Sequence, residues 1–582
     1  MKKVLISLLL LPVFMSVSCG GRNAGDSGEN GSTGDNGDTG EVCATEGETR
    51  SIQCGYNGSG TQEQTCTDGY WENDGDCDDP DECENEDTQL VACGYNDNGT
   101  QNQLCISGQW EDDGDCDDSD ECENEDTQLV ACGYNNNGTQ DLLCVSGQWE
   151  DDGDCDDPDE CEKDTVRTID GAVEVCVEGQ WQYLRETRQW GSSGRDEGWS
   201  IAVDSNDNIY VTGHTEGAID GNTHAGRDDI FLTKYSNNGT KEWTEQWGTS
   251  GNCRGRSVAV DSNDNIYVTG YAYGNLDGNT HAGNYDIFLT KYSADGTKLW
   301  TEQWGTSKDD RGYSVAVDSN DNIYVTGGAG GDLDGNMNAG GLDLFLTKWS
   351  ADGTKLWTRQ WGTSVDEWGH SVEVDSNDNI YVTGYTGGAL DGNMNAGGLD
   401  LFLTKWSADG TKLWTEQWGT SRGDIGWSVA VDSNDSIYVT GHTHGTFDGN
   451  LSAGKEDIFL TKYSTDGTKQ WTRQWGTSEN DRGTSVAVDS NDNIYVTGYT
   501  GGSLDGDLSS VAYAIFFTKY STDGTKQWTK QWGTSGRDEV LSIAVDSNDN
   551  IYVAGRTSEA LDGNLSTGIF DLFFTKWYSE WL

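Results

Sequence analysis

Cysteine is the residue type with the most regular spacing in the first third of the chain. The sequence has 16 cysteines, and all but two lie between Cys43 and Cys176. Cys54, Cys93 and Cys132 follow one another at 39 residues. An even set of regularly spaced cysteines is typical of a disulfide framework. We expect disulfides, with a pairing that the sequence does not specify, among Cys43, Cys54, Cys66, Cys77, Cys83, Cys93, Cys105, Cys116, Cys122, Cys132, Cys144, Cys155, Cys161 and Cys176.

Carboxylates crowd around these cysteines and offer oxygen atoms to a divalent cation. Runs of Asp-Gly-Asp-Cys-Asp-Asp recur in the cysteine repeats, and Ca²⁺ prefers oxygen ligands of this kind. The runs resemble the acidic calcium repeats of extracellular stalks, without the regular length of those repeats. They supply the calcium candidates of the chain, and no other cofactor is expected: Asp76, Asp78, Asp115, Asp117, Asp154 and Asp156.

The last two thirds of the chain carry seven short segments that differ in sequence between otherwise uniform repeats. Each follows a copy of Gln-Trp-Gly, and the segments read, for example, Ser-Gly-Asn-Cys-Arg, Ser-Lys-Asp-Asp-Arg and Ser-Val-Asp-Glu-Trp. Diversity confined to one side of a uniform scaffold is typical of loops that bind ligands. The candidate ligand residues in or beside these predicted loops are Arg195, Asp196, Arg254, Arg256, Asp310, Arg311, Glu367, Trp368, His370, Arg422, Asp424, His442, His444 and Arg482.

The same side chains do not form a recognised catalytic pattern. The sequence has no nucleophile elbow, no His-Glu-x-x-His and no phosphate-binding loop. Asp-Gly-Thr-x-x-Trp resembles the blade motif of quinoprotein dehydrogenases, and a carboxylate pair for sugar chemistry stays open among so many acids. We predict a protein that is not an enzyme. The alternative is a secreted enzyme, either a carbohydrate lyase or hydrolase or a quinoprotein.

Three smaller groups of residues have both a chemical and a structural interpretation. His224 and His281 stand one repeat apart and could share a metal ion, or they are ordinary loop residues. Asp204 and Asp207 offer oxygen atoms to Ca²⁺, or they form a turn by bonding their own backbone. Cys253 is unpaired by count, and is either a reactive thiol or an inert residue. We favour the structural interpretation in each case, and expect no metal site here.

The elements that carry these residues repeat with a constant period. Ile-Tyr-Val begins at Ile209 and returns every 57 residues up to Ile551. A fixed period of this length indicates a repeat architecture. Each unit contains four short runs of β-favouring residues separated by turn-forming residues, in the second unit 257–261, 266–270, 286–292 and 298–304. Four short antiparallel strands per unit predict the blade of a β-propeller.

The two ends of the repeat predict closure of a ring. Gln189 begins a copy of Gln-Trp-Gly, the end of a fourth strand, before the first complete unit, whereas the last unit stops after its third run at Trp577. Residues 184–190 should therefore supply the missing fourth strand, which removes exposed sheet edges. The predicted fold is all-β: a seven-bladed β-propeller closed by the N- and C-terminal strands, preceded by small disulfide-rich repeats.

Residues 310–327 and 343–357 resemble the bacterial seven-bladed β-propeller repeat family, and more distantly NHL repeats. The resemblance extends to all seven units. It implies the fold and export from the cytoplasm, but no shared biochemical activity. The expected organisation is a signal peptide at 1–18, a flexible linker at 19–42, a cysteine-rich stalk at 43–182 and the propeller at 183–582.

The N-terminus is typical of a secretory signal: a basic start, a short apolar run and small residues before a cleavage point. Ser16-Val17-Ser18-Cys19 resembles the bacterial lipobox, although Ser16 stands where leucine is usual. The resemblance implies a lipid on Cys19. The expected location is the bacterial outer membrane, on the cell surface or facing the periplasm.

The net charge of −66 limits the partners. Repulsion from phosphates makes nucleic acid an unfavourable ligand. We expect a monomer that meets the membrane through its lipid and binds a protein or a glycan on one face of the propeller. A structural spacer of the cell envelope without a ligand is the third hypothesis.

Overall fold

The computed structural model describes residues 180–506 and 513–581 and, before them, shorter stretches: 47–54, 60–68, 70–78, 88–93, 99–106, 109–112, 127–132, 138–145, 148–151, 165–169 and 171–177. The chain divides into two compact units, Met1–Ala131 with Thr139–Asp156, and Cys132–Gly138 with Asp157–Leu582. The lipidation candidate Cys19, residues 1–42 and the side chains of the six calcium candidates lie outside the described part.

The cysteine repeats form three small antiparallel sheets of three strands each. Their strands are β1 (Thr49–Cys54), β2 (Gly60–Thr67) and β3 (Tyr70–Asp78); β4 (Thr88–Cys93), β5 (Gly99–Ile106) and β6 (Gln109–Asp112); and β7 (Thr127–Cys132), β8 (Gly138–Val145) and β9 (Gln148–Asp151). Cys66 and Cys176 are disulfide-bonded and buried. The side chains of the other twelve cysteines predicted to form disulfides lie outside the described part.

Six four-stranded sheets follow, with strands in chain order. Blades 1 to 3 comprise β13 (Asp196–Val203), β14 (Ile209–Thr215), β15 (Asp229–Tyr235) and β16 (Lys241–Trp247); β17 (Cys253–Val260), β18 (Ile266–Ala272), β19 (Asp286–Tyr292) and β20 (Lys298–Trp304); and β21 (Asp310–Val317), β22 (Ile323–Ala329), β23 (Asp343–Trp349) and β24 (Lys355–Trp361). Blades 4 to 6 comprise β25 (Glu367–Val374), β26 (Ile380–Thr386), β27 (Asp400–Trp406) and β28 (Lys412–Trp418); β29 (Asp424–Val431), β30 (Ile437–Thr443), β31 (Asp457–Tyr463) and β32 (Lys469–Trp475); and β33 (Asp481–Val488), β34 (Ile494–Thr500), β35 (Ala514–Tyr520) and β36 (Lys526–Trp532).

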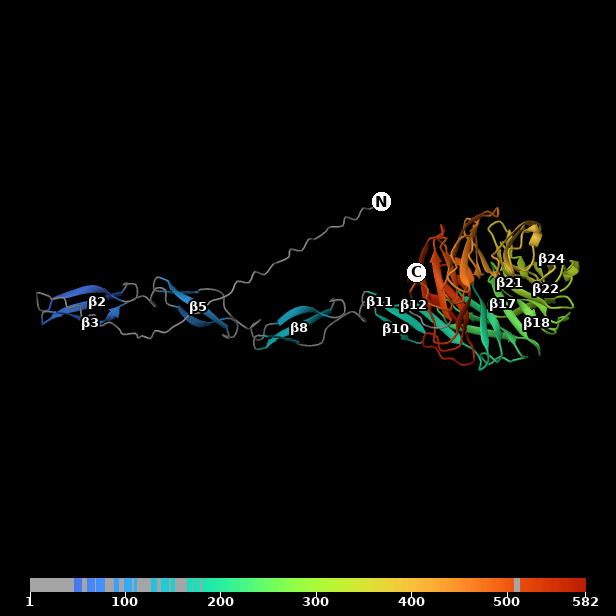
Figure 1. Cartoon of the computed structure of the whole chain (residues 1–582). Helices are drawn as coiled ribbons and strands as arrows, with labels where there is room; N and C mark the ends of the chain where they lie inside the picture. The colour runs from blue at the N-terminus through green and yellow to red at the C-terminus, as the bar shows by residue number, and fades with distance from the viewer. Residues whose placement is uncertain are drawn as a thin grey trace. The chain divides into compact units, whose positions relative to one another are not determined.

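The seventh blade joins the two ends of the propeller and confirms the predicted closure. Its first three strands are β37 (Asp538–Val545), β38 (Ile551–Thr557) and β39 (Asp571–Trp577), and its fourth is β12 (Gln180–Trp190) from the start of the repeat. β12 runs antiparallel to β39, with Arg185 opposite Trp577 and Trp190 opposite Leu572. In Figure 1 the strands follow one another around the ring as the colour passes from green to red.

The sheet of blade 7 continues beyond its predicted outer strand. β10 (Val166–Ile169) and β11 (Ala172–Val177) form a hairpin, and β11 pairs with β12 over residues 180–186. This sheet therefore has six strands, in the order β10-β11-β12-β39-β38-β37. The expected boundary between 182 and 183 falls inside β12, so the last cysteine repeat and the propeller share one sheet.

The hydrophobic core of the propeller lies between adjacent blades. Tyr210 and Leu232 of blade 1 pack with Val268 and Phe288 of blade 2, all fully buried. Equivalent clusters lie at the other six boundaries, including the one between blades 7 and 1. The two middle strands of each blade are buried on both faces, which explains their continuous apolar and aromatic sequence. Burial of aromatic and β-branched side chains on both faces holds the blades together.

Repeated hydrogen bonds also link each blade to the next, all the way round the ring. The Ser200 hydroxyl accepts a bond from the backbone N–H of Val258 at 3.2 Å, and Ser542 accepts the corresponding bond from Ile201 at 3.2 Å across the closing boundary. In the Asp-Ser-Asn-Asp-Asn turn, whose first four residues are the same in all seven blades, Asp264 accepts bonds from the backbone and hydroxyl of Ser205, both at 3.1 Å. The invariant residues of the repeat are thus joints between blades.

The same turn gives its first aspartate a structural role. Asp204 accepts bonds from the backbone N–H groups of Asn206 and Asn208 and from the Tyr210 hydroxyl, each at 2.9 Å. Its oxygen atoms are occupied by the turn itself, as an Asx-type turn predicts.

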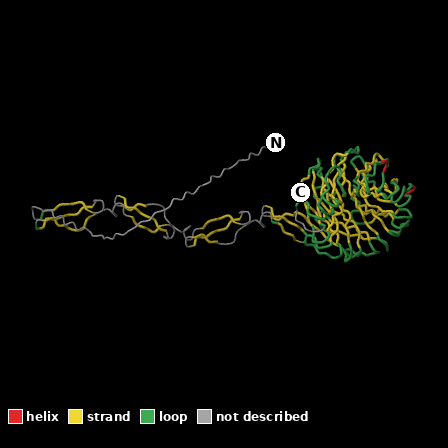
Figure 2. The backbone as a smooth tube through the Cα atoms, in the orientation of Figure 1, coloured by secondary structure: helices red, strands yellow, loops and turns green. Residues whose placement is uncertain are grey.

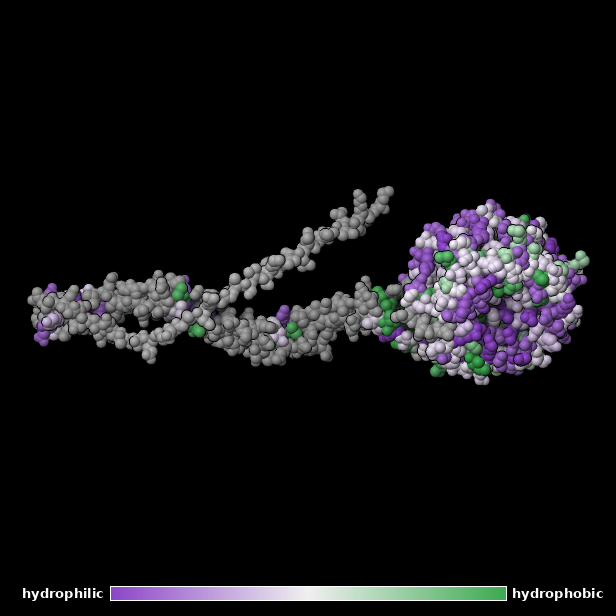
Figure 3. Space-filling view, in the orientation of Figure 1, coloured by the Kyte–Doolittle hydropathy of each residue, from purple (hydrophilic) through white to green (hydrophobic). Residues whose placement is uncertain are grey.

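Strands and connecting loops make up nearly all of the described chain (Figure 2). Helical structure among the described residues consists of 3-10 turns at Leu333–Gly335, Leu390–Gly392 and Ser579–Trp581. None of the described helices has the length and apolar character needed to cross a bilayer. On the face of the propeller visible in Figure 3, apolar residues are scattered among hydrophilic ones rather than gathered into one patch.

Candidate ligand-binding site

The variable segments predicted as loops end in strand: the last two of their five residues begin the first strand of each blade. In blade 2 the first strand begins at Cys253, four residues before its predicted start at Ser257, because Cys253 and Arg254 pair with Ala272 and Tyr271 of β18. The neighbouring strand has strong β character and draws the polar segment into the ladder, an override of local composition by tertiary pairing. Most of the candidate ligand residues therefore lie on the first strands of the blades.

Each of these first strands contains a β-bulge. The register of β13 against β14 shifts between Gly198 and Ser200, which leaves Trp199 without a partner. A bulge bends its strand and re-aims the extra residue. The seven bulge residues, one from each blade, are Trp199, Arg256, Tyr313, His370, Trp427, Thr484 and Leu541.

All seven bulge residues line one cavity of about 560 Å³. Because every blade contributes to it, the cavity lies at the mouth of the central channel, where the first strands meet. The volume falls within the usual range for small-molecule sites, roughly 300–1,000 Å³. We call it the mouth cavity.

The mouth cavity is asymmetric although the blades are nearly identical. Blades 1 to 5 present large bulge residues, whereas blades 6 and 7 present Thr484 and the smaller apolar Leu541. Around those two residues the wall includes Arg482, Tyr499, Arg537, Glu539 and Arg556, all from the same two blades. Beside these short side chains, other residues of blades 6 and 7 reach the cavity wall.

Aromatic rings form much of the opposite wall. The imidazole of His370 stacks on the indole of Trp427, with centroids 4.2 Å apart and planes 4° from parallel. Tyr313 meets Trp368 edge to face at 5.2 Å. Flat rings of this kind offer large apolar contact with specific geometry.

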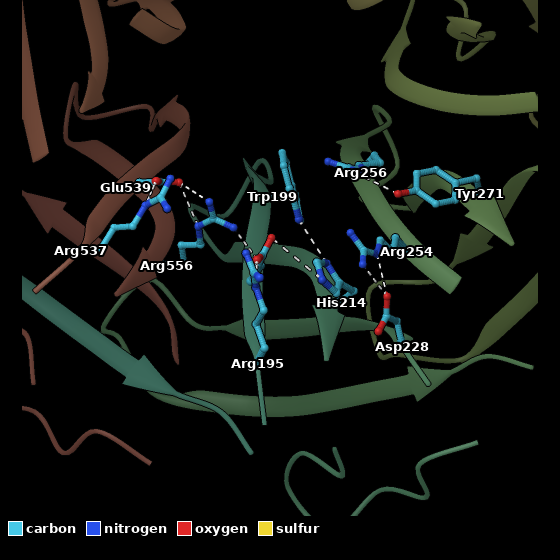
Figure 4. Close-up of polar contacts among 11 residues, drawn as sticks. Arg195, Trp199, His214, Asp228, Arg254, Arg256, Tyr271, Arg537, Glu539 and Arg556 are labelled. Carbon is cyan, nitrogen blue, oxygen red and sulfur yellow. Dashed lines mark hydrogen bonds and ion pairs between the residues drawn. The ribbon is translucent and has the colours of Figure 1, made fainter. Parts of the chain in front are cut away.

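A chain of ion pairs crosses the boundary between blades 7 and 1. Arg556 of blade 7 contacts both Glu539 of its own blade and Glu197 of blade 1, while Arg537 pairs with Glu539 and Arg195 with Glu197. Figure 4 shows Arg537, Glu539 and Arg556 close together, with Arg195 beyond them. Burial alone would raise the pKa of Glu197, but His214, Arg556 and Arg195 lower it to about 2. Glu197 therefore stays charged, and both carboxylates are paired with arginine.

Two blades repeat a tryptophan–histidine pair. The Trp199 indole donates to His214 Nδ1 at 3.2 Å, and Trp427 donates to His442 Nδ1 at 3.0 Å. Burial lowers the pKa of His442 to about 3 and that of His370 to about 4. These imidazoles are therefore neutral at physiological pH, with the His442 proton on Nε2.

His442, His444 and Glu456 come within 4.8 Å of one another through ligand-type atoms. Their hydrogen bonds do not suit a metal ion. Nδ1 of His442 is taken by Trp427, which leaves its Nε2 protonated. His444 donates Nδ1–H to the carbonyl of Gly423 at 2.7 Å, and Glu456 binds the Arg482 guanidinium. What remains for a metal is Nε2 of His444 and, 3.3 Å away, a Glu456 carboxylate that is shared with Arg482.

Four predicted ligand residues are structural and do not face a ligand. Asp196, Asp310, Glu367 and Asp424 are fully buried. Asp310, for example, accepts a bond from the backbone N–H of Thr306 at the preceding turn, and burial raises its pKa to about 6. None of the four lines the mouth cavity.

Cys253 occupies the same structural position in blade 2. It is a free, fully buried cysteine at 3.4 Å from the Thr249 hydroxyl. Burial raises the pKa of its thiol, so little thiolate forms at neutral pH. The structure thus supports an inert residue that replaces the usual aspartate.

The other predicted residues divide between the cavity and its surroundings. Arg256, Trp368, His370 and Arg482 line the mouth cavity. Arg254 pairs with Asp228 at 2.7 Å, and Arg422 is exposed on its loop. The remaining ones lie nearby without lining it: Arg195, Arg311, His442 and His444.

Most residues of the cavity wall were not among the predicted ligand residues. Trp199, Tyr313, Trp427, Thr484 and Leu541 were not predicted, although one signal could have found them. When the repeats are aligned at the period of 57, the fourth residue of the first strand holds six residue types in seven blades. The position of greatest variation within a uniform strand marks the cavity.

The chain matches one protein-family model seven times. The model is described as a β-propeller repeat (SBBP), and it matches residues 187–219, 242–277, 299–334, 356–390, 413–448, 470–505 and 527–561. The matches recur at the sequence period and cover the strands that surround the mouth cavity.

Two curated proteins are similar to this chain. The uncharacterized WD repeat-containing protein L264 of Acanthamoeba polyphaga mimivirus is 24% identical over 495 residues, covering 64% of this chain and 36% of that protein. The regulatory protein FlaEY of Caulobacter vibrioides is 25% identical over 401 residues, covering 62% and 37%. The chain thus spans little more than a third of the length of these relatives.

Among solved structures, the Neurospora crassa Pan2 WD40 domain aligns with a TM-score of 0.39 and 9% identity, covering 67% of this chain and 95% of the domain. The polysaccharide lyase Uly1 aligns with a TM-score of 0.39 and 12% identity, covering 71% and 98%. Similarity at this level carries no argument about the function of this chain.

Proposed function

We propose that this chain, a β-propeller repeat protein of the SBBP type, is a non-catalytic binding protein that takes its ligand into the mouth cavity. One observation carries the proposal: in the first strand of the blades, the position that varies most is the bulge residue, which lines this cavity in all seven. A repeat that conserves its joints and varies its central wall is suited to hold one asymmetric ligand.

The polar groups of the cavity support binding over catalysis. Glu539 is the carboxylate in its wall, and it is ion-paired with both Arg537 and Arg556. His370 is stacked on Trp427, and its Nδ1 is bonded to the carbonyl of Gly426 at 3.0 Å. A general base needs a free lone pair within reach of a substrate proton. Glu539 is engaged by two guanidiniums, and the free Nε2 lone pair of His370 is a weak base, because burial lowers the pKa of this imidazole to about 4.

The rest of the proposal rests on the sequence. A lipid on Cys19 would hold the protein on the outer membrane, and the disulfide-linked repeats would space the propeller from it as a stalk. Disulfide-bonded Cys66 is consistent with the stalk. The protein would act as a monomer on an extracellular or periplasmic protein or glycan.

Filling the cavity tests its role. Thr484→Trp places an indole in the cavity wall, at a position where blades 1 and 5 already carry tryptophan. The purified chain is first applied to glycan and protein arrays, with and without Ca²⁺, and each ligand found is measured by calorimetry. We expect the variant to lose at least about tenfold in affinity, or about 1.4 kcal/mol, with an unchanged melting temperature.

Leu413→Gln is the matched control. Leu413 is exposed on an outer strand, and blades 5 and 6 have glutamine at the equivalent position. This variant should bind like the parent. Full affinity in the Thr484→Trp variant would contradict a ligand site in the cavity.

A further inference from the structure

Arg256 differs from the other arginines of the mouth cavity in having no carboxylate partner among the described residues. Arg482 pairs with Glu456, and Arg537 and Arg556 pair with Glu539. The one hydrogen bond of the Arg256 side chain goes from Nη2 to the Tyr271 hydroxyl at 3.0 Å. Its Nε is buried and has no hydrogen-bond partner. In Figure 4 the dashed line from Arg256 leads to the Tyr271 hydroxyl.

Aromatic rings hold this guanidinium in place. Its central carbon lies 3.8 Å from the ring centroid of Trp199, 5.3 Å from that of Tyr313 and 5.4 Å from that of Tyr271. Cation–π contacts keep a guanidinium planar against a ring while its edge stays available for hydrogen bonds. The position is therefore organised before any ligand arrives.

The lack of a carboxylate partner for Arg256 is unusual in so acidic a chain. Asp and Glu outnumber Lys and Arg by 101 to 35, and a half-buried cation without an anion is unfavourable. Arg254, two residues away, has Asp228. Blade 2 could equally place a carboxylate beside Arg256. The unpaired N–H donors of Arg256 are therefore better explained by an anion from outside the chain.

The lowered pKa of a neighbouring phenol indicates a positive electrostatic potential around Arg256. Burial would raise the pKa of the Tyr271 phenol, but Arg256, Arg254 and Arg311 lower it below its ordinary value. The cavity imidazole of His370 is neutral, because burial lowers its pKa to about 4. The positive charge near Arg256 thus comes from arginine and does not depend on pH near neutrality.

We infer that the mouth cavity binds an acidic saccharide, whose carboxylate or sulfate group pairs with Arg256. This inference rests on the proposed function and names its ligand class. Arginine binds planar carboxylates and tetrahedral anions through paired N–H donors. The stacked His370–Trp427 pair and the Trp199 ring offer flat faces for the C–H surface of a sugar ring.

A saccharide suits the wall better than an acidic peptide. Ile425 and Leu541 are the aliphatic residues that line the cavity, so the described wall has little to enclose an apolar side chain. Aromatic rings, hydroxyls and guanidiniums make up most of the rest, and these groups match the alternating apolar faces and hydroxyl edges of a sugar.

Binding of a trigalacturonate tests the inference against its neutral methyl ester. Calorimetry on the full purified chain should show the acid binding at least about tenfold more tightly than the ester, as one charge-assisted pair predicts. Arg256→Gln should lose that advantage, while Arg422→Gln, which removes an exposed arginine outside the cavity, should change affinity by less than about twofold. A sulfated disaccharide serves as the second anionic probe, and hexaglutamate as the peptide probe.

The other outcomes separate this inference from the proposed function. Equal binding of acid and ester, unaffected by Arg256→Gln, overturns the role of Arg256 and leaves the cavity as a site for neutral glycans. Binding of hexaglutamate without either acidic sugar overturns the saccharide class. Failure of both acidic sugars also overturns it, and the Thr484→Trp variant with an array ligand then decides whether the cavity binds anything else.

Discussion

Glu373 stands alone in its position of the repeat. The other six blades have alanine there: Ala202, Ala259, Ala316, Ala430, Ala487 and Ala544. The Glu373 side chain is half-buried, and its one hydrogen bond comes from the backbone N–H of Val374 at 3.3 Å. Burial raises its pKa to about 7. Its charged form therefore weakens the fold.

We predict that Glu373→Ala stabilises the protein at alkaline pH. The folded state holds its proton up to about pH 7, whereas the unfolded chain ionises near about 4.3. Wild-type stability is thus lost progressively between these two pH values, by roughly 2 kcal/mol after allowance for solvent. Urea unfolding at pH 8 should show the variant to be the more stable.

Below about pH 4 the two proteins should unfold alike, because Glu373 is then protonated in both states. Glu216→Ala, at an exposed glutamate of blade 1, is the control and should show no such pH dependence. A Glu373→Ala variant that is equally stabilised at pH 4 and pH 8 would contradict the assignment.

At the residue scale, the sequence marks the variable segments but not the direction in which each side chain points. Asp424 and Arg482 both occur in variable polar segments, yet Asp424 is buried and Arg482 lines the cavity. The difference comes from alternation along the strand and from the bulge, which adds one residue to it. Neither composition nor period reveals a bulge, so the side of each residue could not be predicted.

At the scale of strands, the ring depends on the pairing of β12 with β39. The other six blades are each continuous in sequence, whereas this one unites residues about 390 positions apart, such as Thr187 and Thr575, whose hydroxyls lie 2.8 Å apart. Arg185 adds an ion pair to Asp562 at 2.7 Å. In blade 7 this pairing replaces the chain connection that joins the third and fourth strands of every other blade.

We predict that Arg188→Pro destabilises the propeller more than Arg359→Pro. Both residues occupy the same place on an outer strand, and both donate Nε to a glycine carbonyl of the next blade, Gly239 and Gly410 respectively. Proline removes a ladder N–H in either case. Only the first opens the ring, so its fall in melting temperature should be at least about twice as large.

Hydrogen exchange locates the effect. Arg188→Pro should increase exchange in blades 7 and 1, while Arg359→Pro should affect blade 3 alone. Equal and local effects in the two variants would show that the closing pairing is not the weak point of the ring.

Strand order and closure were predictable because the period is constant and the last unit lacks a fourth strand. The hairpin β10–β11 was not. Its residues belong to the last cysteine repeat by composition, and the short runs Val166–Ile169 and Ala172–Val177 carry no propeller motif. Their pairing with β12 depends on the exposed outer edge of that strand, which only the assembled sheet presents.

At the scale of the whole molecule, the net charge of −66 opposes the approach of an anionic ligand. The long-range field repels an acidic saccharide, while the attraction of Arg256 acts over a short distance inside the cavity. Salt screens the long-range repulsion more than the short-range attraction of Arg256, since the Debye length is about 10 Å at 0.1 M.

The association rate of trigalacturonate should therefore rise several-fold as NaCl increases from about 10 to about 150 mM. Stopped-flow tryptophan fluorescence follows it, because Trp199, Trp368 and Trp427 line the cavity. The methyl ester is the neutral control. A rate that falls steeply with salt would indicate attraction by an extended basic surface, which the charge distribution does not predict.

The most direct test of the account is a crystal structure of the protein with a ligand identified on the arrays. The account predicts the ligand in the mouth cavity, in contact with bulge residues of several blades, including Arg256 or Trp427. A ligand bound on the outer strands or at the Asp-Ser-Asn-Asp-Asn turns, with the mouth cavity empty, would contradict it.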